Sequence, residues 1–205
     1  MEKINGNTGA QIWNVTFQTD EGKASDENDS HSGVGQGVVG RDLFVSSVDV
    51  DRAGDVVLAM STEGTIFDST GSPTPKRGRY DIVVVKLRAT DGSKMWHSRL
   101  GSSSDDFATG IVIDPRGNEN GGERDVFVGG RTKGKSILTG SASGDGSVGG
   151  FDAFVVKLAG ASGYPSFEKI YGTKMEDEAV GFGLLWEWAE RGRDRDRDSN
   201  RDRDR

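Results

Sequence analysis

The sequence predicts an all-β protein made of antiparallel four-stranded units that follow one another along the chain. Glycine accounts for 31 of the 205 residues, and helix interiors avoid that much glycine. Short runs rich in Val, Ile and Phe alternate with Gly, Asp, Asn and Ser, which is typical of strands joined by turns. A sequence repeat supports the same fold class, because repeats of this kind are characteristic of architectures in which each unit packs on its neighbour.

The repeat is clearest between residues 80–110 and 151–181, which align without a gap at an offset of 71. The identical positions are Asp81 and Asp152, Val84–Leu87 and Val155–Leu158, Gly92 and Gly163, Gly101 and Gly172, Asp106 and Asp177, Ala108 and Ala179, and Gly110 and Gly181. A third copy lies near the N-terminus, where Lys3, Gly9 and Trp13 match Lys86, Gly92 and Trp96 at an offset of 83. The larger offset predicts an insertion, which we place in the acidic, Gly- and Ser-rich stretch Thr19–Gly40.

Each full unit is expected to contain four strands. The first unit has them at Asp42–Val50, Asp55–Ser61, Asp81–Arg88 and Lys94–Leu100, and the second at Thr109–Asp114, Asp125–Arg131, Asp152–Ala159 and Ser166–Tyr171. Asp- and Gly-containing turns at 51–54 and 90–93 predict hairpins. The longer stretch 115–124 predicts an extended surface loop.

These units divide the chain into consecutive parts. Residues 1–41 form the end of one unit plus the insertion, 42–100 the first full unit, 101–171 the second, 172–183 the start of a further unit, and 184–205 a Trp-containing junction with an Arg-Asp tail. The tail is of low complexity and cannot bury a core, so we expect it to be disordered.

Four-stranded antiparallel units at this spacing predict the blades of a β-propeller, packed face to face around an axis. Three segments also resemble the SBBP-type β-propeller repeat family: FDAFVVKL at 151–158, GSSSDDFATGI at 101–111 and VDRAGDV at 50–56. The resemblance covers roughly residues 1–183. It implies a propeller fold, an extracellular or cell-surface location and a binding role, and it brings no catalytic residues.

About two and a half blades are present, whereas a closed propeller needs about four to eight. We therefore expect a fragment of a larger ring, with association with other blades or chains as the alternative. The first residues lead into a polar turn, so no signal peptide is expected in this chain. No apolar run is long enough to predict a membrane span.

Charge and cysteine content exclude several classes of function. The formal net charge is −7, and residues 191–205 carry seven Arg and five Asp, which leaves −9 on residues 1–190. An acidic body of this kind is not expected to bind nucleic acid. The chain has no cysteine, which excludes disulfides and cysteine metal sites.

Residues 129–136 match the GxxxxGK[ST] string of phosphate-binding loops, with Lys135 and Ser136 in the phosphate and magnesium positions. That chemistry needs a helix to follow, but the next ten residues are rich in Gly and Ser. The equivalent loop of the preceding unit, 59–66, keeps Thr and Gly and lacks the lysine. Both observations count against a nucleotide site, so nucleotide binding is only our second alternative function.

The carboxylates of Asp49, Asp51 and Asp55 form a DxDxxxD pattern around a hairpin turn. Oxygen-rich loops of this type can bind calcium, and the alternative is a turn in which an aspartate binds local amides. No other cofactor is expected. The two histidines, His31 and His97, do not form a metal or catalytic cluster by sequence.

We expect a non-enzymatic propeller fragment that serves as a protein-interaction or structural module. The long loops Thr19–Gly40, Thr62–Arg79 and Lys133–Gly150 would form its variable surface. The alternative is a carbohydrate-binding or carbohydrate-active propeller, which needs exposed aromatic residues beside acids. Aromatic residues available for that role are Trp13, Trp96 and Phe167, which better fit a blade core, and Trp186 and Trp188.

Overall fold

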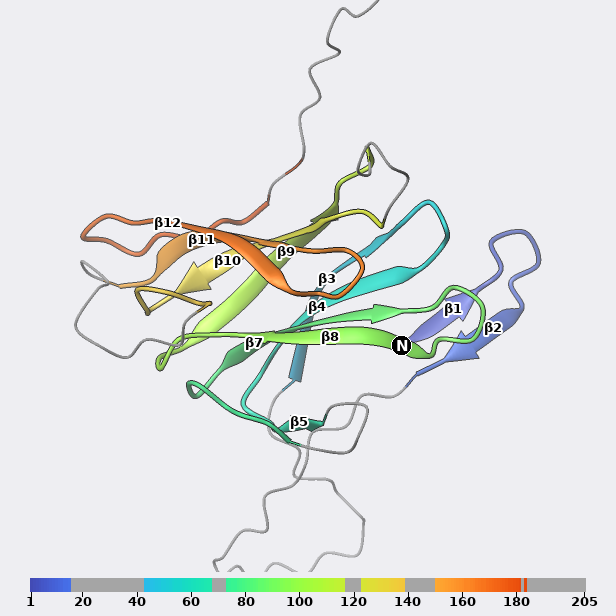
Figure 1. Cartoon of the computed structure of the whole chain (residues 1–205), viewed down its shortest axis with the longest axis horizontal. Helices are drawn as coiled ribbons and strands as arrows, with labels where there is room; N and C mark the ends of the chain where they lie inside the picture. Colours follow the sequence, from blue (N-terminus) through green and yellow to red (C-terminus); the bar gives the residue numbers. More distant parts are fainter. Residues whose placement is uncertain (16–42, 68–72, 117–122, 139–149, 182, 184–205) are drawn as a thin grey trace, which may run out of the picture.

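The computed structural model describes residues 1–15, 43–67, 73–116, 123–138, 150–181 and 183. These residues form twelve β-strands and no helix, in two four-stranded antiparallel sheets and two two-stranded ribbons (Figure 1). The predicted all-β, antiparallel class is therefore confirmed. The insertion at Thr19–Gly40 and the Arg-Asp tail lie outside the described residues.

The first sheet has the strand order β3-β4-β7-β8 and the second the order β12-β11-β10-β9. The strands of the first are β3 (Leu43–Val50), β4 (Val56–Thr62), β7 (Asp81–Leu87) and β8 (Lys94–Leu100). Those of the second are β9 (Asp106–Ile113), β10 (Val126–Thr132), β11 (Asp152–Leu158) and β12 (Pro165–Tyr171). The ribbons are β1 (Glu2–Ile4) with β2 (Gln11–Asn14), and β5 (Ile66–Phe67) with β6 (Pro73–Thr74).

The predicted strands of both sheets agree with the observed bounds to within one residue, except at the start of β9. This strand begins at Asp106, three residues before the predicted Thr109. The pairing of β9 with β10 continues through a β-bulge at Gly129 and Gly130, so that Asp106 lies opposite Thr132. The backbone N–H of Asp106 also donates to the carbonyl of Tyr80, which precedes β7. The start of β9 therefore depends on its partner strand and on this bulge, which a local sequence pattern does not show.

The central strands of the first sheet are buried on both faces. Successive residues of a strand point to opposite faces, and all residues of β4 and β7 are buried. On one face Val57, Ala59, Ile82 and Val84 share a core with Ile111, Phe154 and Val156 of the second sheet. On the other face Val56, Leu58, Met60, Val83 and Val85 share a core with Trp13 of the β1–β2 hairpin.

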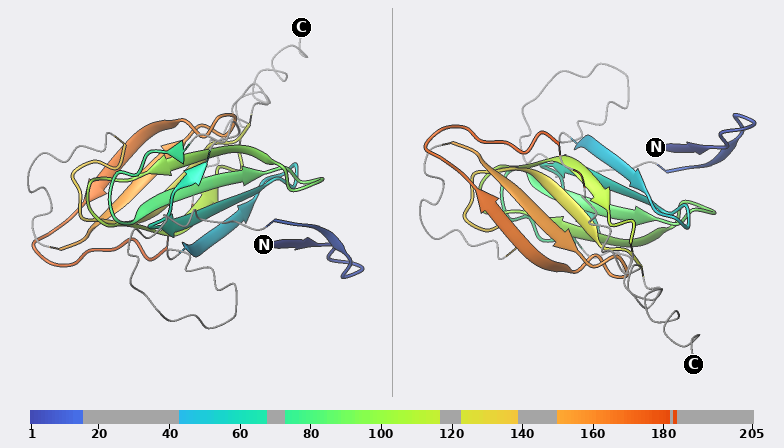
Figure 2. Two further views of the ribbon diagram at one scale, coloured as in Figure 1. Left: turned by 90° about the horizontal axis from the view of Figure 1, so that it is seen from below. Right: turned by 90° about the horizontal axis from the view of Figure 1, so that it is seen from above.

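Among the described residues, the second sheet is fully covered on one face only. Phe154, Val156 and Leu158 of β11 are buried against the first sheet, while Ala153, Val155 and Lys157 on the opposite face are half-buried. Figure 2 shows the two sheets as stacked layers, with the β1–β2 hairpin at the side. The chain thus has an outward face on the second sheet.

A tryptophan–glycine contact recurs between neighbouring units. Gly92 and Gly163 occupy hairpins at φ of +72° and +70°, a left-handed conformation that favours glycine. Trp13 packs on Gly92, and Trp96 packs on Gly163. Each indole N–H also donates to a carbonyl oxygen of the same hairpin, Trp13 to Ala89 at 3.0 Å and Trp96 to Gly160 at 2.8 Å. The repeat seen in the sequence is therefore also a repeat of packing contacts.

The segment expected to begin a further unit is not a strand in residues 172–181 and 183. It nevertheless repeats contacts of β9, because the N–H of Asp177 donates to the carbonyl of Phe151 as that of Asp106 does to Tyr80. A strand needs a hydrogen-bonded neighbour, and this segment has no ladder partner among the described residues. Within the described part of the chain, no helix is long and apolar enough to cross a membrane.

Candidate functional site

The long connections leave from strand ends that lie on one side of both sheets, and we call this row of strand ends the loop edge. Thr62 at the end of β4 pairs with Asp81 at the start of β7, and Thr132 at the end of β10 pairs with Asp152 at the start of β11. The connections 63–80 and 133–151 therefore leave from this edge. Binding residues concentrate on loops held by a rigid scaffold, which makes the loop edge the candidate functional site.

Four aromatic rings form a row along the loop edge. Phe44 of β3, Tyr80 before β7, Phe107 of β9 and Phe151 before β11 have centroid separations of 6.2, 4.9 and 5.8 Å in that order. The row crosses from the first sheet to the second. Phe44 is 50% exposed, and the other three rings are half-buried.

Cations cover three of these rings. The guanidinium of Arg79 lies 5.4 Å from the Tyr80 centroid, and that of Arg131 lies 5.2 Å from Phe107 and 4.6 Å from Phe151. Lys133 Nζ is 4.4 Å from the Phe151 centroid. Such contacts are favourable because a ring face carries negative electrostatic potential. We call these four rings and three cations the aromatic–cation row.

Acids pair with each of the three cations. Arg79 Nε is 2.6 Å from Glu63, Arg131 Nε is 3.7 Å from Glu178, and Lys133 Nζ is 3.8 Å from Asp105. Exposed pairs of this kind contribute little stability, but they limit the orientations of the cations. The aromatic–cation row is therefore a nearly neutral surface and not a basic patch.

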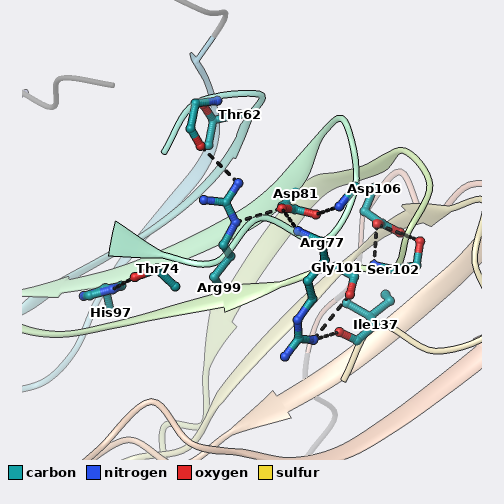
Figure 3. Close-up of polar contacts among 12 residues, drawn as sticks. Thr62, Thr74, Arg77, Asp81, His97, Arg99, Gly101, Ser102, Asp106 and Ile137 are labelled. Carbon is teal, nitrogen blue, oxygen red and sulfur yellow. Dashed lines mark hydrogen bonds and ion pairs between the residues drawn. The ribbon is translucent and has the colours of Figure 1, made fainter. Parts of the chain in front are cut away.

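A buried ion pair joins the connection 63–80 to the first sheet (Figure 3). Arg99 Nε donates to Asp81 Oδ2 at 2.7 Å, and both side chains are buried. Asp81 also accepts the backbone N–H groups of Arg77 and Gly78, while Arg99 Nη2 donates to the carbonyl of Gly64. Both ends of the connection, and thereby Tyr80, are fixed by this pair.

A second buried acid lies at the start of β9. Asp106 accepts hydrogen bonds from the backbone N–H and the hydroxyl of Ser102 and from the hydroxyl of Thr132. Burial raises the pKa of this carboxyl to about 6, although the hydrogen bonds from Thr132 and Ser102 act in the opposite direction. The adjacent residue is Phe107, so Asp106 positions the third ring of the row.

The guanidinium of Arg77 joins the two long connections to each other. It donates to the carbonyls of Ile137 and Leu138, both at 2.8 Å, and to that of Gly101 at 3.3 Å. Ile137 is fully buried between the sheets. The loop edge is therefore supported by contacts between the two sheets as well as within each.

The structure places the three calcium candidates at the opposite edge, where they bind groups of the protein. Asp49 accepts the N–H of Ile113. Asp51 and Asp55 lie 3.1 and 3.9 Å from the ammonium of Lys86. Among the described residues, no three His, Cys, Asp or Glu side chains are grouped as a metal site, so the structure does not bring the candidates together as ligands.

Lys86 is almost fully buried and lies among carboxylates. Its ammonium is 2.6 Å from Glu123 Oε2 as well as near Asp51 and Asp55. Burial opposes its charge, yet hydrogen bonds to Glu123 and Asp51 hold the pKa of Lys86 above its ordinary value. A cation of the protein thus already occupies the space between these acids.

The phosphate-loop string lies at the end of β10, and its polar groups are engaged within the chain. The Ser136 hydroxyl donates to Glu168 Oε1 at 2.6 Å, and the N–H of Ile137 donates to Glu168 Oε2 at 2.9 Å. The N–H of Gly134 donates to the hydroxyl of Thr132. The described residues after the string, 137 and 138, are not helical.

The remaining candidates occupy different environments. Trp13 and Trp96 are buried between units, whereas Phe167 is 47% exposed on β12. His97 shares a hydrogen bond with Thr74 Oγ1 at 3.1 Å. His31, Trp186 and Trp188 lie outside the described residues.

Sequence reasoning missed the aromatic–cation row. The repeat contained a signal for it, because Tyr80 aligns with Phe151 at the offset of 71, and Phe44 aligns with Phe107 at an offset of 63. What the alignment lacks is the packing of one sheet on the other, which places these two pairs of rings in one line.

No protein-family model, curated protein or solved structure matches the chain. The resemblance to the SBBP-type repeat therefore depends on the repeated residues themselves.

Proposed function

We propose that the chain is part of a β-propeller of the SBBP type and serves as a non-enzymatic protein-interaction module. The two four-stranded sheets would be its full blades, at 42–100 and 101–171. The observation that carries this proposal is the tryptophan–glycine contact, which joins successive units twice through equivalent residues. Face-to-face packing of equivalent four-stranded sheets is the arrangement found in propellers.

The aromatic–cation row is the proposed binding surface. Arginine and the aromatic residues, tyrosine among them, are enriched in the centres of protein interfaces. Here Tyr80 and Phe107 are next in sequence to the buried residues Asp81 and Asp106, so the backbone that carries these two rings is held in place before binding, which lowers the entropy cost. The neutral charge of the row and the 50% exposure of Phe44 favour a partner that inserts an apolar side chain beside that ring.

A carbohydrate ligand is less well supported. Sugars stack on open ring faces, but Arg79, Arg131 and Lys133 lie over Tyr80 and Phe151. The buried positions of Trp13 and Trp96 also remove them as platforms. Nucleotide binding at 129–136 is disfavoured because Glu168 binds the amide and hydroxyl groups that a phosphate would need.

Selection from a displayed random-peptide library, with a glycan array in parallel, tests this proposal. We expect peptides that bind the wild-type chain and lose binding to Phe44→Ala and Arg79→Ala, since both side chains are exposed. Tyr164→Ala is the matched control, because Tyr164 is 73% exposed at the opposite edge. Binding of glycans alone, or peptide binding that both row variants retain, would contradict the proposal.

A further inference from the structure

Equivalent positions of the repeat are buried at the interface between the two sheets and exposed at both outer faces. Ala108, Ile111 and Ile113 of β9 face the first sheet and are at most 9% exposed. The equivalent residues of β3 are Val45, Val48 and Val50, which are 57, 53 and 52% exposed. Register confirms the equivalence, because these valines pair with Met60, Leu58 and Val56 on the face away from the second sheet.

The β1–β2 hairpin has the same property. Ile4 is 56% exposed, whereas its equivalents Leu87 and Leu158 are 1 and 0% exposed. Gly9 has a φ of +68°, like Gly92 and Gly163, but a Cβ added to it would meet no described atom within 4 Å. Gly9 is thus a hairpin glycine of the same kind as Gly92 and Gly163, and no aromatic ring of the described residues packs on it.

The outward face of the second sheet carries the complementary group. Phe167 is equivalent to Trp13 and Trp96, and it is 47% exposed where they are 6 and 8% exposed. The same sheet carries a hollow of about 600 Å³, in which Ala153, Ile170 and Tyr171 lie beside the charged residues Lys169, Asp177 and Glu178. At the equivalent place on the first sheet, Ile137 of the next unit is fully buried.

We propose that a second copy of this chain docks head to tail on the outward face of the second sheet. Phe167 of one copy would pack on Gly9 of the other, as Trp96 packs on Gly163 within the chain. Residues 177–181 are equivalent in the repeat to the start of β9. They would lie against the valines of β3 in the other copy. We assign a second copy as the partner because the interface between the two sheets of one chain already joins these two kinds of face.

This contact is heterologous, so it closes into a ring or continues as a filament. The inference depends on the proposed blade arrangement but not on the proposed ligand surface. The proposed contact centres on Phe167, Gly9 and the valines of β3, whereas the aromatic–cation row lies at the loop edge. Glu178 is common to both, because it lines the hollow and pairs with Arg131. Substitutions at Val48 or Phe167 change no residue of the row.

Light scattering during size-exclusion chromatography of the full chain is the first test. We expect species whose mass is a multiple of 22.0 kDa and increases with protein concentration. Val48→Asp and Phe167→Asp should each abolish these species, because each places a charge in a buried apolar contact. Tyr164→Asp should retain them, since Tyr164 stays 73% exposed beside a tryptophan–glycine contact that is already formed.

Cross-linking gives the orientation. The chain has no cysteine, so Lys169→Cys and Thr8→Cys proteins each carry one thiol. Lys169 is equivalent to Ser98, whose hydroxyl donates to the carbonyl of Gly163, and Thr8 is next to Gly9. A short bismaleimide should join the two proteins only when they are mixed. A 22.0 kDa monomer at all concentrations, or cross-linking of Lys169→Cys to itself, would overturn the inference, and neither result would affect peptide binding at the row.

Discussion

Replacing Gly163 with alanine tests whether the tryptophan–glycine contact joins the two sheets. Gly163 has a φ of +70°, where a side chain costs about 1–2 kcal/mol. A Cβ at this position would also lie 2.5 Å from Cε3 of Trp96, so the buried indole would have to move. Overpacking of this kind costs about 1–3 kcal/mol. We expect the free energy of unfolding to decrease by about 2–5 kcal/mol.

Gly54→Ala is the matched control. Gly54 is also a hairpin glycine at positive φ, +85°, but its added Cβ would lie at an ordinary 3.4 Å from Ala89 Cβ. Its free energy of unfolding should decrease only by the cost of a side chain at positive φ, about 1–2 kcal/mol. A second control is Gly163→Ala in a Trp96→Leu background, where the cost should fall but stay above that of Gly54→Ala, because the added Cβ would still lie 2.8 Å from Ser98 Oγ.

Urea unfolding followed by far-ultraviolet circular dichroism gives the free energy of unfolding of the wild-type chain, of the three single variants and of the double variant. This signal does not depend on tryptophan, so it suits the Trp96→Leu background. If Gly163→Ala and Gly54→Ala lost the same free energy, or if the Trp96→Leu background left the cost of Gly163→Ala unchanged, the ring would not be in contact with the hairpin. The assignment of this contact as the link between units would then be wrong.

Three further predictions concern single buried groups. Trp96→Phe removes the N–H that donates to Gly160 and should cost about 1–2 kcal/mol in the urea assay. Lys86→Met leaves the acids around Lys86 without their cation and should lower the melting temperature in calorimetry more than Lys157→Met, whose side chain is 35% exposed. Asp106 has a pKa of about 6, above the ordinary 3.8, so the folded chain holds a proton that the unfolded chain releases between about pH 4 and 6. The free energy of unfolding should therefore fall as pH rises through this range, and Asp106→Asn should remove that slope in urea titrations.

The strands could be predicted because their signals are local. β7 and β11 are apolar runs followed by the same Lys-Leu pair, and glycines that require positive φ mark the hairpins. The early start of β9 could not be predicted, because it depends on a β-bulge that keeps Asp106 paired with Thr132 of β10.

The candidate sites were harder to predict for a similar reason. The spacing of Asp49, Asp51 and Asp55 suggests a cation but does not show that Lys86 is the cation beside two of them. A strand lysine is ordinarily expected to be solvated, and its partner Glu123 comes from a loop of the next unit. Likewise, Tyr80 and Phe107 become neighbours only when the sheets stack.

The ring at the repeated tryptophan position sets the relative strength of the contacts between units. Trp13 and Trp96 each combine packing on a glycine with one hydrogen bond, whereas Phe167 can offer packing alone. The proposed contact between copies should therefore be weaker than those within the chain by about one hydrogen bond, or about 0.5–1.5 kcal/mol. Phe167→Trp would restore the donor, which should then reach the Gly6 carbonyl of the other copy, the position equivalent to Ala89 and Gly160. We expect sedimentation equilibrium to show an association about two- to tenfold tighter, and weaker association of Phe167→Trp would mean that the second copy does not dock in the same register as the sheets within the chain.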